Sequence, residues 1–139
     1  MNKNFKTELL IEIPFYDLDP MAIVWHGNYI KYFEKTRCQL LENFDFGYIE
    51  MRNSGYMWPI VDLKVKYVES AVFGQKICCS AEIVEFENRL KINYQIRCVK
   101  TNNRLTKGYT TQVAVDLKTK ELQLVSPEIL LTKLGVAHD

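Results

Sequence analysis

The sequence predicts an α+β fold, in which an antiparallel sheet of about five strands wraps around one long central helix. Two observations lead to this prediction. Several segments alternate apolar and polar residues with a period of two, and one long segment repeats its apolar residues at helical spacing. The apolar face of the sheet and the apolar stripe of the helix would bury each other, which is the simplest way to build a core from them.

The strand segments begin with an alternating stretch from Thr7 to Ile13, which ends near Pro14. After Pro59 the alternation returns in four further segments: 61–67, 77–86, 90–98 and 109–117. A single polar face on such strands is typical of an antiparallel sheet that is covered on one side. The edges of that sheet would accept a second copy of the chain.

The long helix is predicted from about Asn28 to Phe44, with Asn28 as its N-cap and Gly47 beyond its end. Its apolar positions are Ile30, Phe33, Leu40, Leu41 and Phe44. A short helical turn is expected within 46–52. A last helix is expected after Ser126, because Pro127 suits the first helical position.

The length and composition indicate one globular domain over residues 1–139, since the chain has 139 residues and is 47% hydrophobic. A net charge of +1 argues against a dedicated nucleic-acid binder. No apolar run reaches the roughly 20 residues of a membrane span, and the N-terminus lacks the apolar stretch of a signal peptide. The four cysteines form no CxxC pair and are expected to be reduced and mostly buried, as in the cytoplasm.

The segment from Asp17 to Tyr29 concentrates most of the chemistry of the chain. Two carboxylates, Asp17 and Asp19, come before an apolar run, and His26 follows directly before the helix. A carboxylate can act as a base or as a nucleophile, and the free N–H groups at a helix start can hold a developing oxyanion. From local sequence alone, Asp19 is equally well explained as a turn residue before Pro20.

The same segment resembles the 4-hydroxybenzoyl-CoA thioesterase family, and within it the acyl-CoA thioesterases associated with the Tol–Pal system. The resemblance rests on Asp17-Leu18-Asp19, on the run to Trp25-His26-Gly27-Asn28-Tyr29, and on the helix motif Tyr32-Phe33-Glu34-Lys35-Thr36-Arg37. A weaker block at Tyr67–Ile77 fits the strand–turn–strand pattern of the family. Together these motifs cover nearly the whole chain.

The resemblance implies a hotdog fold, assembly as a homodimer or homotetramer, and hydrolysis of acyl-CoA without a metal or another cofactor. It places the catalytic carboxylate on Asp19 and the backbone N–H that polarises the thioester carbonyl on His26. Ala22 stands where the family usually has glycine. If that position needs a positive φ, Ala22 predicts a different loop path.

Other residues are expected to support or bind rather than react. Asp17, Asn28 and Tyr29 are predicted to shape the loop and the helix start, although two carboxylates on one side would raise each other's pKa. Trp25 is assigned to the wall of the acyl pocket. On a polar strand face, Arg89 and Lys91 are candidates for the CoA phosphates, although the simpler interpretation is a solvated surface.

Two other functions are compatible with these residues. The fold could serve as a non-hydrolytic module that binds acyl-CoA or acyl-carrier protein, and Ala22 is the feature that keeps this alternative open. Asp17, Asp19 and His26 could instead be three ligands of a hydrolytic metal. The metal alternative ranks last, because no further ligand lies near them in the sequence.

Overall fold

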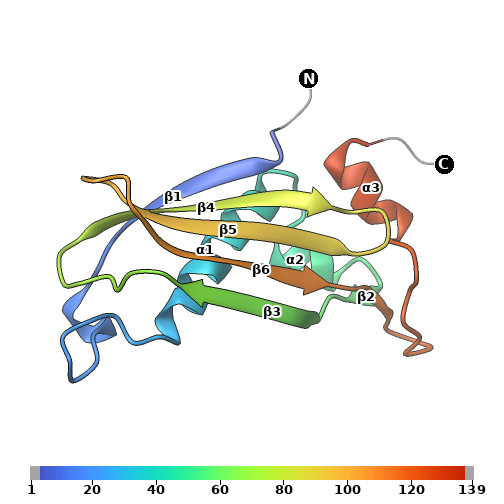
Figure 1. Cartoon of the computed structure of the whole chain (residues 1–139). Coiled ribbons are helices and arrows are strands. Elements are labelled where there is room, and N and C mark those ends of the chain that lie inside the picture. Colours follow the sequence, from blue (N-terminus) through green and yellow to red (C-terminus); the bar gives the residue numbers. More distant parts are fainter. Residues whose placement is uncertain (1–3, 137–139) are drawn as a thin grey trace.

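The computed structural model of the chain describes residues 4–136. Strand β1 (Lys6–Glu12) and the short 3₁₀ helix η1 (Phe15–Asp17) precede helix α1 (Asn28–Glu42) and helix α2 (Tyr48–Arg52). The strands that follow are β2 (Tyr56–Met57), β3 (Ile60–Tyr67), β4 (Lys76–Glu85), β5 (Leu90–Cys98), β6 (Arg104–Gln112) and β7 (Val115–Asp116). Helix α3 (Glu128–Leu134) closes the described chain, and Figure 1 shows these elements.

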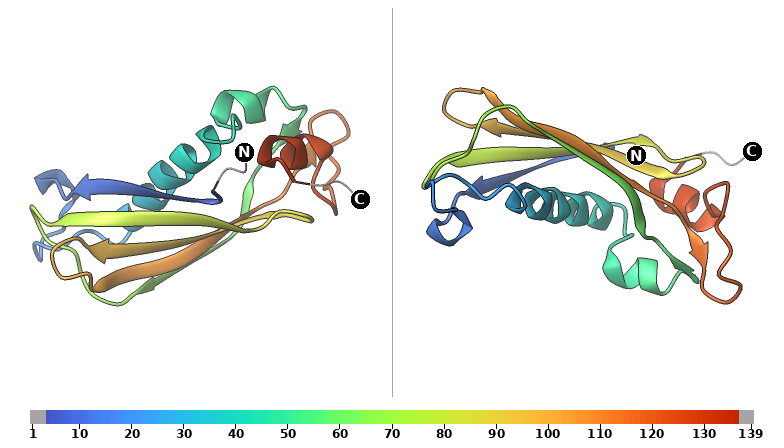
Figure 2. Two further views of the ribbon diagram at one scale, coloured as in Figure 1. Left: turned by 90° about the horizontal axis from the view of Figure 1, so that it is seen from above. Right: turned by 60° about the horizontal axis from the view of Figure 1, so that its bottom comes forward.

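The main sheet has five strands in the order β1-β4-β5-β6-β3, and each neighbouring pair is antiparallel. Helix α1 lies across one face of this sheet, so the molecule has two layers (Figure 2). This arrangement confirms the predicted α+β hotdog architecture. The short strands β2 and β7 pair separately at one end.

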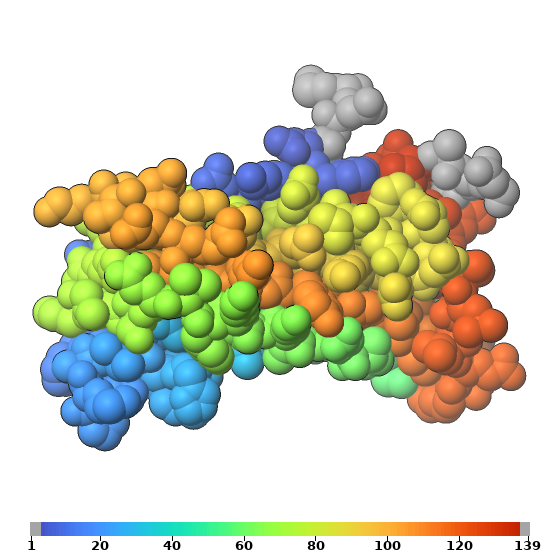
Figure 3. Space-filling view, viewed as in Figure 1, coloured from blue at the N-terminus to red at the C-terminus, as the bar shows by residue number. Residues whose placement is uncertain are grey.

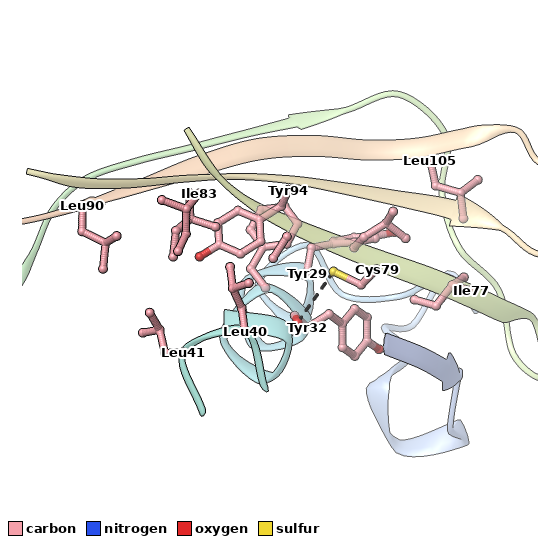
Figure 4. Packing of buried hydrophobic residues seen from close by; sticks show 14 of the residues in the cluster. Tyr29, Tyr32, Leu40, Leu41, Ile77, Cys79, Ile83, Leu90, Tyr94 and Leu105 are labelled. Atoms are coloured by element: carbon pink, nitrogen blue, oxygen red, sulfur yellow. Dashed lines mark hydrogen bonds between the residues drawn. The ribbon is translucent and has the colours of Figure 1, made fainter. Parts of the chain in front are cut away.

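The core lies between α1 and the sheet. Alternate residues of β4 and β5, such as Ile77 and Ile92, face the helix and are fully buried. Phe33 of α1 stacks on Tyr94 of β5, with ring centroids 4.4 Å apart and planes 7° apart. Figure 4 shows this packing, together with the Cys79 thiol donating to the Tyr32 carbonyl at 3.8 Å. Burial of these side chains holds α1 in place, and α1 in turn positions the loop before it.

Strand β3 differs from the inner strands because it lies at an edge of the sheet and is exposed along most of its length. Its apolar side chains Val61, Leu63 and Tyr67 are 57%, 40% and 49% exposed. The sequence predicted a covered face for this strand, and within one chain that prediction is wrong. An exposed apolar edge strand can pair with another chain.

Several boundaries differ from the sequence prediction. Helix α1 ends at Glu42 rather than near Phe44, and its N-cap is Gly27 rather than Asn28. The last long strand, β6, begins at Arg104, five residues before the predicted start at Tyr109. The predicted segment 109–117 therefore covers the end of β6 and the separate short strand β7. Helix α3 has Pro127 as its N-cap. Cys38 is exposed, against the prediction that the cysteines are mostly buried, and all four cysteines are free.

Candidate active site

The loop between η1 and α1 (residues 18–27, the site loop) folds back on itself before the helix begins. The Asp19 N–H donates to the Ile23 carbonyl at 2.8 Å, and the Ala22 N–H donates to the Asp19 carbonyl at 2.9 Å. Pro20 occupies the second position of this turn, where its fixed φ is favourable. In Figure 3 the site loop, in blue, protrudes at one end of the molecule beside the end of β3.

Ala22 adopts a φ of 63°, in the left-handed region that L-residues rarely adopt. The loop therefore keeps a left-handed residue here although the side chain is not that of glycine. Ala22 thus accepts the strain of a positive φ, and a loop path different from that of the family stays a prediction. Strain of this kind costs about 1–2 kcal/mol and persists only where the surrounding structure enforces it.

Asp19 is partly exposed at the tip of the site loop. Its Oδ1 accepts a hydrogen bond from the Met21 N–H at 2.8 Å, which is the turn role that local sequence allowed. Its Oδ2 accepts no hydrogen bond from residues 4–136. One carboxylate oxygen thus fixes the side chain, and the other is available to a substrate.

His26 lies at the start of α1, directly before the N-cap Gly27. Within residues 4–136 the His26 N–H and the Gly27 N–H have no acceptor, whereas the Asn28 N–H donates to the Trp25 carbonyl at 2.9 Å. Unpaired N–H groups at a helix start carry partial positive charge and can hold an anion or a polarised carbonyl. The exposed imidazole packs beside Trp25, with ring centroids 5.0 Å apart.

Asp19 and His26 line one hollow, which has a volume of about 270 Å³. The other wall comes from Tyr67 at the end of β3 and from the segment that follows it, Val68–Ser70. The Tyr67 hydroxyl donates to the His26 carbonyl at 2.8 Å and so ties β3 to the helix start. Tyr29 forms the floor, and its hydroxyl accepts the Ala71 N–H at 3.0 Å.

Asp17 has a different environment from Asp19. It is buried, with 3% of its surface exposed, and its carboxylate accepts hydrogen bonds from the Tyr32 hydroxyl at 2.6 Å and from Lys31 Nζ at 2.9 Å. Burial raises the pKa of Asp17, but these two hydrogen bonds and the Lys31 charge outweigh it and lower the pKa below its ordinary value. The expectation that a neighbouring carboxylate raises the pKa of Asp17 is therefore wrong.

The backbone of Asp17 also anchors the loop. Its carbonyl accepts the Trp25 N–H at 2.9 Å and the Asn28 side-chain amide at 2.8 Å. This second bond explains why Asn28 is not the N-cap, since its side chain bridges backward to Asp17. Burial raises the pKa of the Tyr32 hydroxyl, and the Asp17 carboxylate raises it further, so Tyr32 stays a neutral donor.

Trp25 is 50% exposed and does not line the hollow that contains Asp19. Its ring lies over Gly27, where an added Cβ would come within 2.3 Å of the indole. Gly27 is thus required by this contact. Within one chain, Trp25 therefore does not form the wall of the acyl pocket that the sequence predicted for it.

Arg89 and Lys91 lie at the opposite end of the sheet from the hollow. Lys91 pairs with Thr111, whereas the hollow lies near Tyr67, whose sheet partner Thr106 faces Ile96. The five residue steps from Lys91 to Ile96 span about 17 Å of strand. Arg89 forms an ion pair with Glu85 at 3.1 Å, and Lys91 Nζ lies 4.4 Å from the centroid of the Tyr109 ring.

The sequence prediction missed three residues that build the site: Tyr67, Lys31 and Tyr32. Tyr67 had a signal, since it opens the second family block. Lys31 and Tyr32 follow the helix start by one turn, which places them beneath the loop that precedes it. Glu34 and Arg37, three residues apart on α1, form an ion pair at 3.7 Å.

The metal-ligand alternative needs Asp17, Asp19 and His26 to converge. Asp17 instead faces Lys31 and Tyr32. Within residues 4–136 no three His, Cys, Asp or Glu side chains gather closely enough to hold a metal ion. In the same range no helix is long and apolar enough to cross a membrane.

Comparison with known proteins assigns the family of the fold. Residues 13–132 match the Thioesterase-like superfamily, and the chain belongs to this family. A Bacillus subtilis protein assigned by inference as an acyl-CoA thioesterase is 27% identical over 76% of this chain and 77% of its own length. A Synechocystis protein assigned by inference as an esterase is 26% identical over 78% of this chain, and the match spans 66% of that relative.

Among solved structures, a 4-hydroxybenzoyl-CoA thioesterase variant in complex with 4-hydroxybenzoyl-CoA superposes with a TM-score of 0.79. The alignment covers 94% of this chain and 99% of that one, at 14% identity. At this identity the likeness establishes the shared fold. Membership in the Thioesterase-like superfamily and the thioesterase assignments of relatives support thioester hydrolysis as the class of activity.

Proposed function

We propose that the protein hydrolyses an acyl-CoA thioester to a carboxylic acid and CoA. The observation that carries the proposal is the shared hollow, which is lined by Asp19, with one unpaired carboxylate oxygen, and by His26, whose N–H at the start of α1 has no acceptor within residues 4–136. A thioester carbonyl in this space would have its oxygen on the N–H of His26. Donors aimed at the developing oxyanion lower the barrier, and each typically contributes about 2.7–4 kcal/mol.

Asp19 then acts by one of two routes. As a nucleophile, its carboxylate oxygen bonds to the carbonyl carbon, the C–S bond breaks, and CoA leaves as a thiolate that takes up a proton. Water then cleaves the resulting anhydride, releasing the acid and regenerating Asp19. As a general base, Asp19 takes a proton from water while the water oxygen attacks, and the C–S bond breaks in the same sense. A single turnover in ¹⁸O-labelled water identifies the nucleophilic route when water attacks the Asp19 carbon of the anhydride, because the label then stays in Asp19 and the released acid is unlabelled. The general-base route puts the label in the acid and leaves none in Asp19.

Asp17, Asn28, Tyr29 and Tyr67 are proposed to position the reacting groups. The Asp17 carbonyl accepts the Asn28 side-chain amide, and the Asp17 carboxylate accepts hydrogen bonds from α1. These bonds fix the two ends of the site loop. Tyr67 holds the His26 carbonyl, which sets the direction of the helix start. Preorganisation of this kind matters because a displacement of about 1 Å can lower the rate about 100-fold.

The acting unit is proposed to be a homodimer or a homotetramer. The exposed edge of β3 leads directly to Tyr67 in the hollow, so a second copy paired there would cover the open site. Antiparallel pairing of β3 with its copy would also bring the far end of one sheet toward the hollow of the other. Trp25, Arg89 and Lys91 would then have a route to the acyl group and the CoA phosphates. Activity per chain should fall on dilution to monomers, and a fully active monomer contradicts this part.

The narrower assignments follow the resemblance. We place the protein with the 4-hydroxybenzoyl-CoA thioesterases and their Tol–Pal-associated branch, and we place the reaction in the cytoplasm. Four free cysteines favour a reducing compartment.

The test is release of thiol from a set of short-chain, long-chain and aryl CoA esters, with and without a chelator. Turnover of at least one ester that persists in chelator is expected. Protein that binds CoA esters but never releases thiol is instead a non-hydrolytic binding module. Activity lost in chelator would support the metal alternative.

A further inference from the structure

A groove with a volume of about 400 Å³ crosses the outer face of the five-stranded sheet, on the side away from α1. Ile92 and Tyr94 of β5 are buried toward α1, so Asn93 and Gln95 point to the outer face, and both line the groove. In Figure 3 the sheet faces the viewer, with β3 in green and β6 in orange. The volume is within the range of small-molecule sites.

Three lysines stand together at the β3–β6 side of this groove: Lys64 and Lys66 of β3, and Lys107 of β6. Lys66 and Lys107 are direct partners in the register, and Gln95 of β5 continues the same row. The Cβ atoms of direct partners lie about 5 Å apart, and two residues along a strand span about 7 Å. Three positive charges therefore share one small part of the outer face.

These charges are not compensated by the described chain. Within residues 4–136, none of the three lysine side chains forms an ion pair or a hydrogen bond. Like charges directly opposite each other destabilise a strand pair, and Lys66 and Lys107 are such a pair. The cluster thus carries a repulsion that a bound anion would remove.

The nearby carboxylates are engaged elsewhere. Glu82 lines the groove on β4, where Lys6 of β1 is its direct partner in the register. Asp62 lies two residues before Lys64 on the outer face of β3, but its carboxylate accepts a hydrogen bond from the Tyr109 hydroxyl at 3.0 Å. The β3–β6 side of the groove is therefore basic, whereas the β1–β4 side is balanced.

The ligand chemistry follows from this charge distribution. Each lysine ammonium is a compact charge with three N–H donors, which suits phosphate oxygens. A single carboxylate carries one charge and leaves most of the cluster uncompensated, whereas two linked phosphate groups carry more charge in a similar space. The side-chain amides of Asn93 and Gln95 add neutral donors beside the cluster.

We propose that this groove binds a free anion that carries two or more phosphate groups. The site is separate from the hollow of the same chain, because Lys66 and Tyr67 are neighbours on β3 and so point to opposite faces of the sheet. The inference stands on the register and the charges, and it does not require the proposed hydrolysis.

The test measures binding of inorganic diphosphate and inorganic phosphate by isothermal titration calorimetry at neutral pH, without divalent cations. We expect one diphosphate site per chain, with a Kd at least about tenfold below that of phosphate, because diphosphate engages more of the lysines. Raising the salt concentration from about 0.05 M to about 0.5 M should weaken binding, since exposed charges are screened.

Variants locate the anion. Lys107→Gln and Lys66→Gln should each weaken diphosphate binding at least about threefold. Each also relieves the repulsion between the two lysines, so the urea midpoint without anion should not fall below that of wild type. Lys118→Gln, at an exposed position after β7, is the matched control and should leave the Kd within about twofold. If Lys107→Gln fails to fold, Lys66→Gln decides.

Three results overturn the proposal. The first is the absence of diphosphate binding, including the case in which the protein binds only vesicles of phosphatidylglycerol. The second is an equal loss of affinity in Lys118→Gln. The third is a rise in the KM for acyl-CoA with added diphosphate that disappears in Lys107→Gln, since it would assign the lysines to the phosphates of CoA. Diphosphate binding is measured without thiol release, so a protein that hydrolyses no thioester would still be tested.

Discussion

Asp17 and Asp19 are two residues apart, yet they lie in opposite environments. Asp17 is buried beneath the site loop and bonded to Lys31 and Tyr32, whereas Asp19 is partly exposed at the tip of the loop with one oxygen unpaired. Asp17 is the last residue of the 3₁₀ turn Phe15–Asp17, whereas Asp19 opens the turn that the Ala22 N–H closes. The difference separates two tasks, because a fully paired carboxylate stabilises structure and an unpaired one can react.

The largest expected effect is the loss of activity in Asp19→Asn. Asparagine keeps the turn acceptor for the Met21 N–H but supplies neither a base nor a nucleophile. We expect kcat to fall at least about 100-fold, the lower range for acid–base catalysis, with little change in the free energy of unfolding. Thiol release and urea unfolding measure the two quantities.

The matched control is Asp116→Asn. Asp116 also caps a turn, accepting the Lys118 and Thr119 N–H groups at 2.8 and 2.9 Å, but it lies on β7 at the other end. The kcat of the Asp116→Asn variant should stay within about twofold of the wild-type kcat. Equal loss in both variants would mean that Asp19 acts only through its turn.

The converse change, Asp17→Ala, should mainly weaken the fold. It leaves the buried Tyr32 hydroxyl without its acceptor and removes the ion pair to Lys31. We expect a loss of about 2–3 kcal/mol in the free energy of unfolding, the upper range for an orphaned buried group. An unchanged unfolding midpoint in urea would show that Asp17 does not anchor the loop.

The pKa of Asp17 predicts a specific pH dependence of stability. Because this pKa is lowered from 3.8 in the folded state, the unfolded chain takes up the proton first as the pH falls. The contribution of Asp17 is therefore fully present above about pH 5 and is lost as the pH falls through the folded pKa. The stability difference between wild type and Asp17→Asn should shrink below about pH 5. A constant difference from pH 7 to pH 3 would contradict the assignment.

The smallest expected effect is on the free energy of unfolding and concerns the strained residue Ala22 of the site loop. Ala22→Gly removes the cost of the positive φ but adds backbone freedom to the unfolded chain, so a net gain of about 0.5–1 kcal/mol in unfolding free energy is expected. Ala22→Val, with a branched Cβ at the same φ, should lose stability. If both variants match wild type in thermal unfolding, Ala22 is not strained.

The sequence allowed the fold to be predicted because its signals are local. Alternation along β4 and β5 and helical spacing in α1 reflect which residues face the core. The strand β3 was predicted, but its apolar residues alternate as in a covered strand and lie at an open edge. A local sequence pattern does not reveal whether an apolar strand face is covered by the same chain, by a second chain, or left open to solvent.

The roles of the candidate site residues stay predictions, and their geometry differs in part from what the spacing indicated. The motif located Asp19 and His26 on one hollow, yet spacing alone placed Asp17 and Asp19 on the same side. The Asp17 carboxylate instead bonds to Lys31 and Tyr32 of α1, contacts that spacing within the loop does not reveal. Tyr67 is 41 positions from His26 in sequence and meets it only through the sheet, so no local pattern could pair them.

The most direct test of the central claim is a crystal structure of Asp19→Asn with the acyl-CoA that the thiol-release set shows to be turned over fastest. The account predicts the thioester oxygen about 2.7–3.1 Å from the backbone N–H of His26. It also predicts the carbonyl carbon about 3–3.5 Å from the side chain at position 19. A thioester bound elsewhere, with the side chain at position 19 facing away from it in every subunit, would contradict the account.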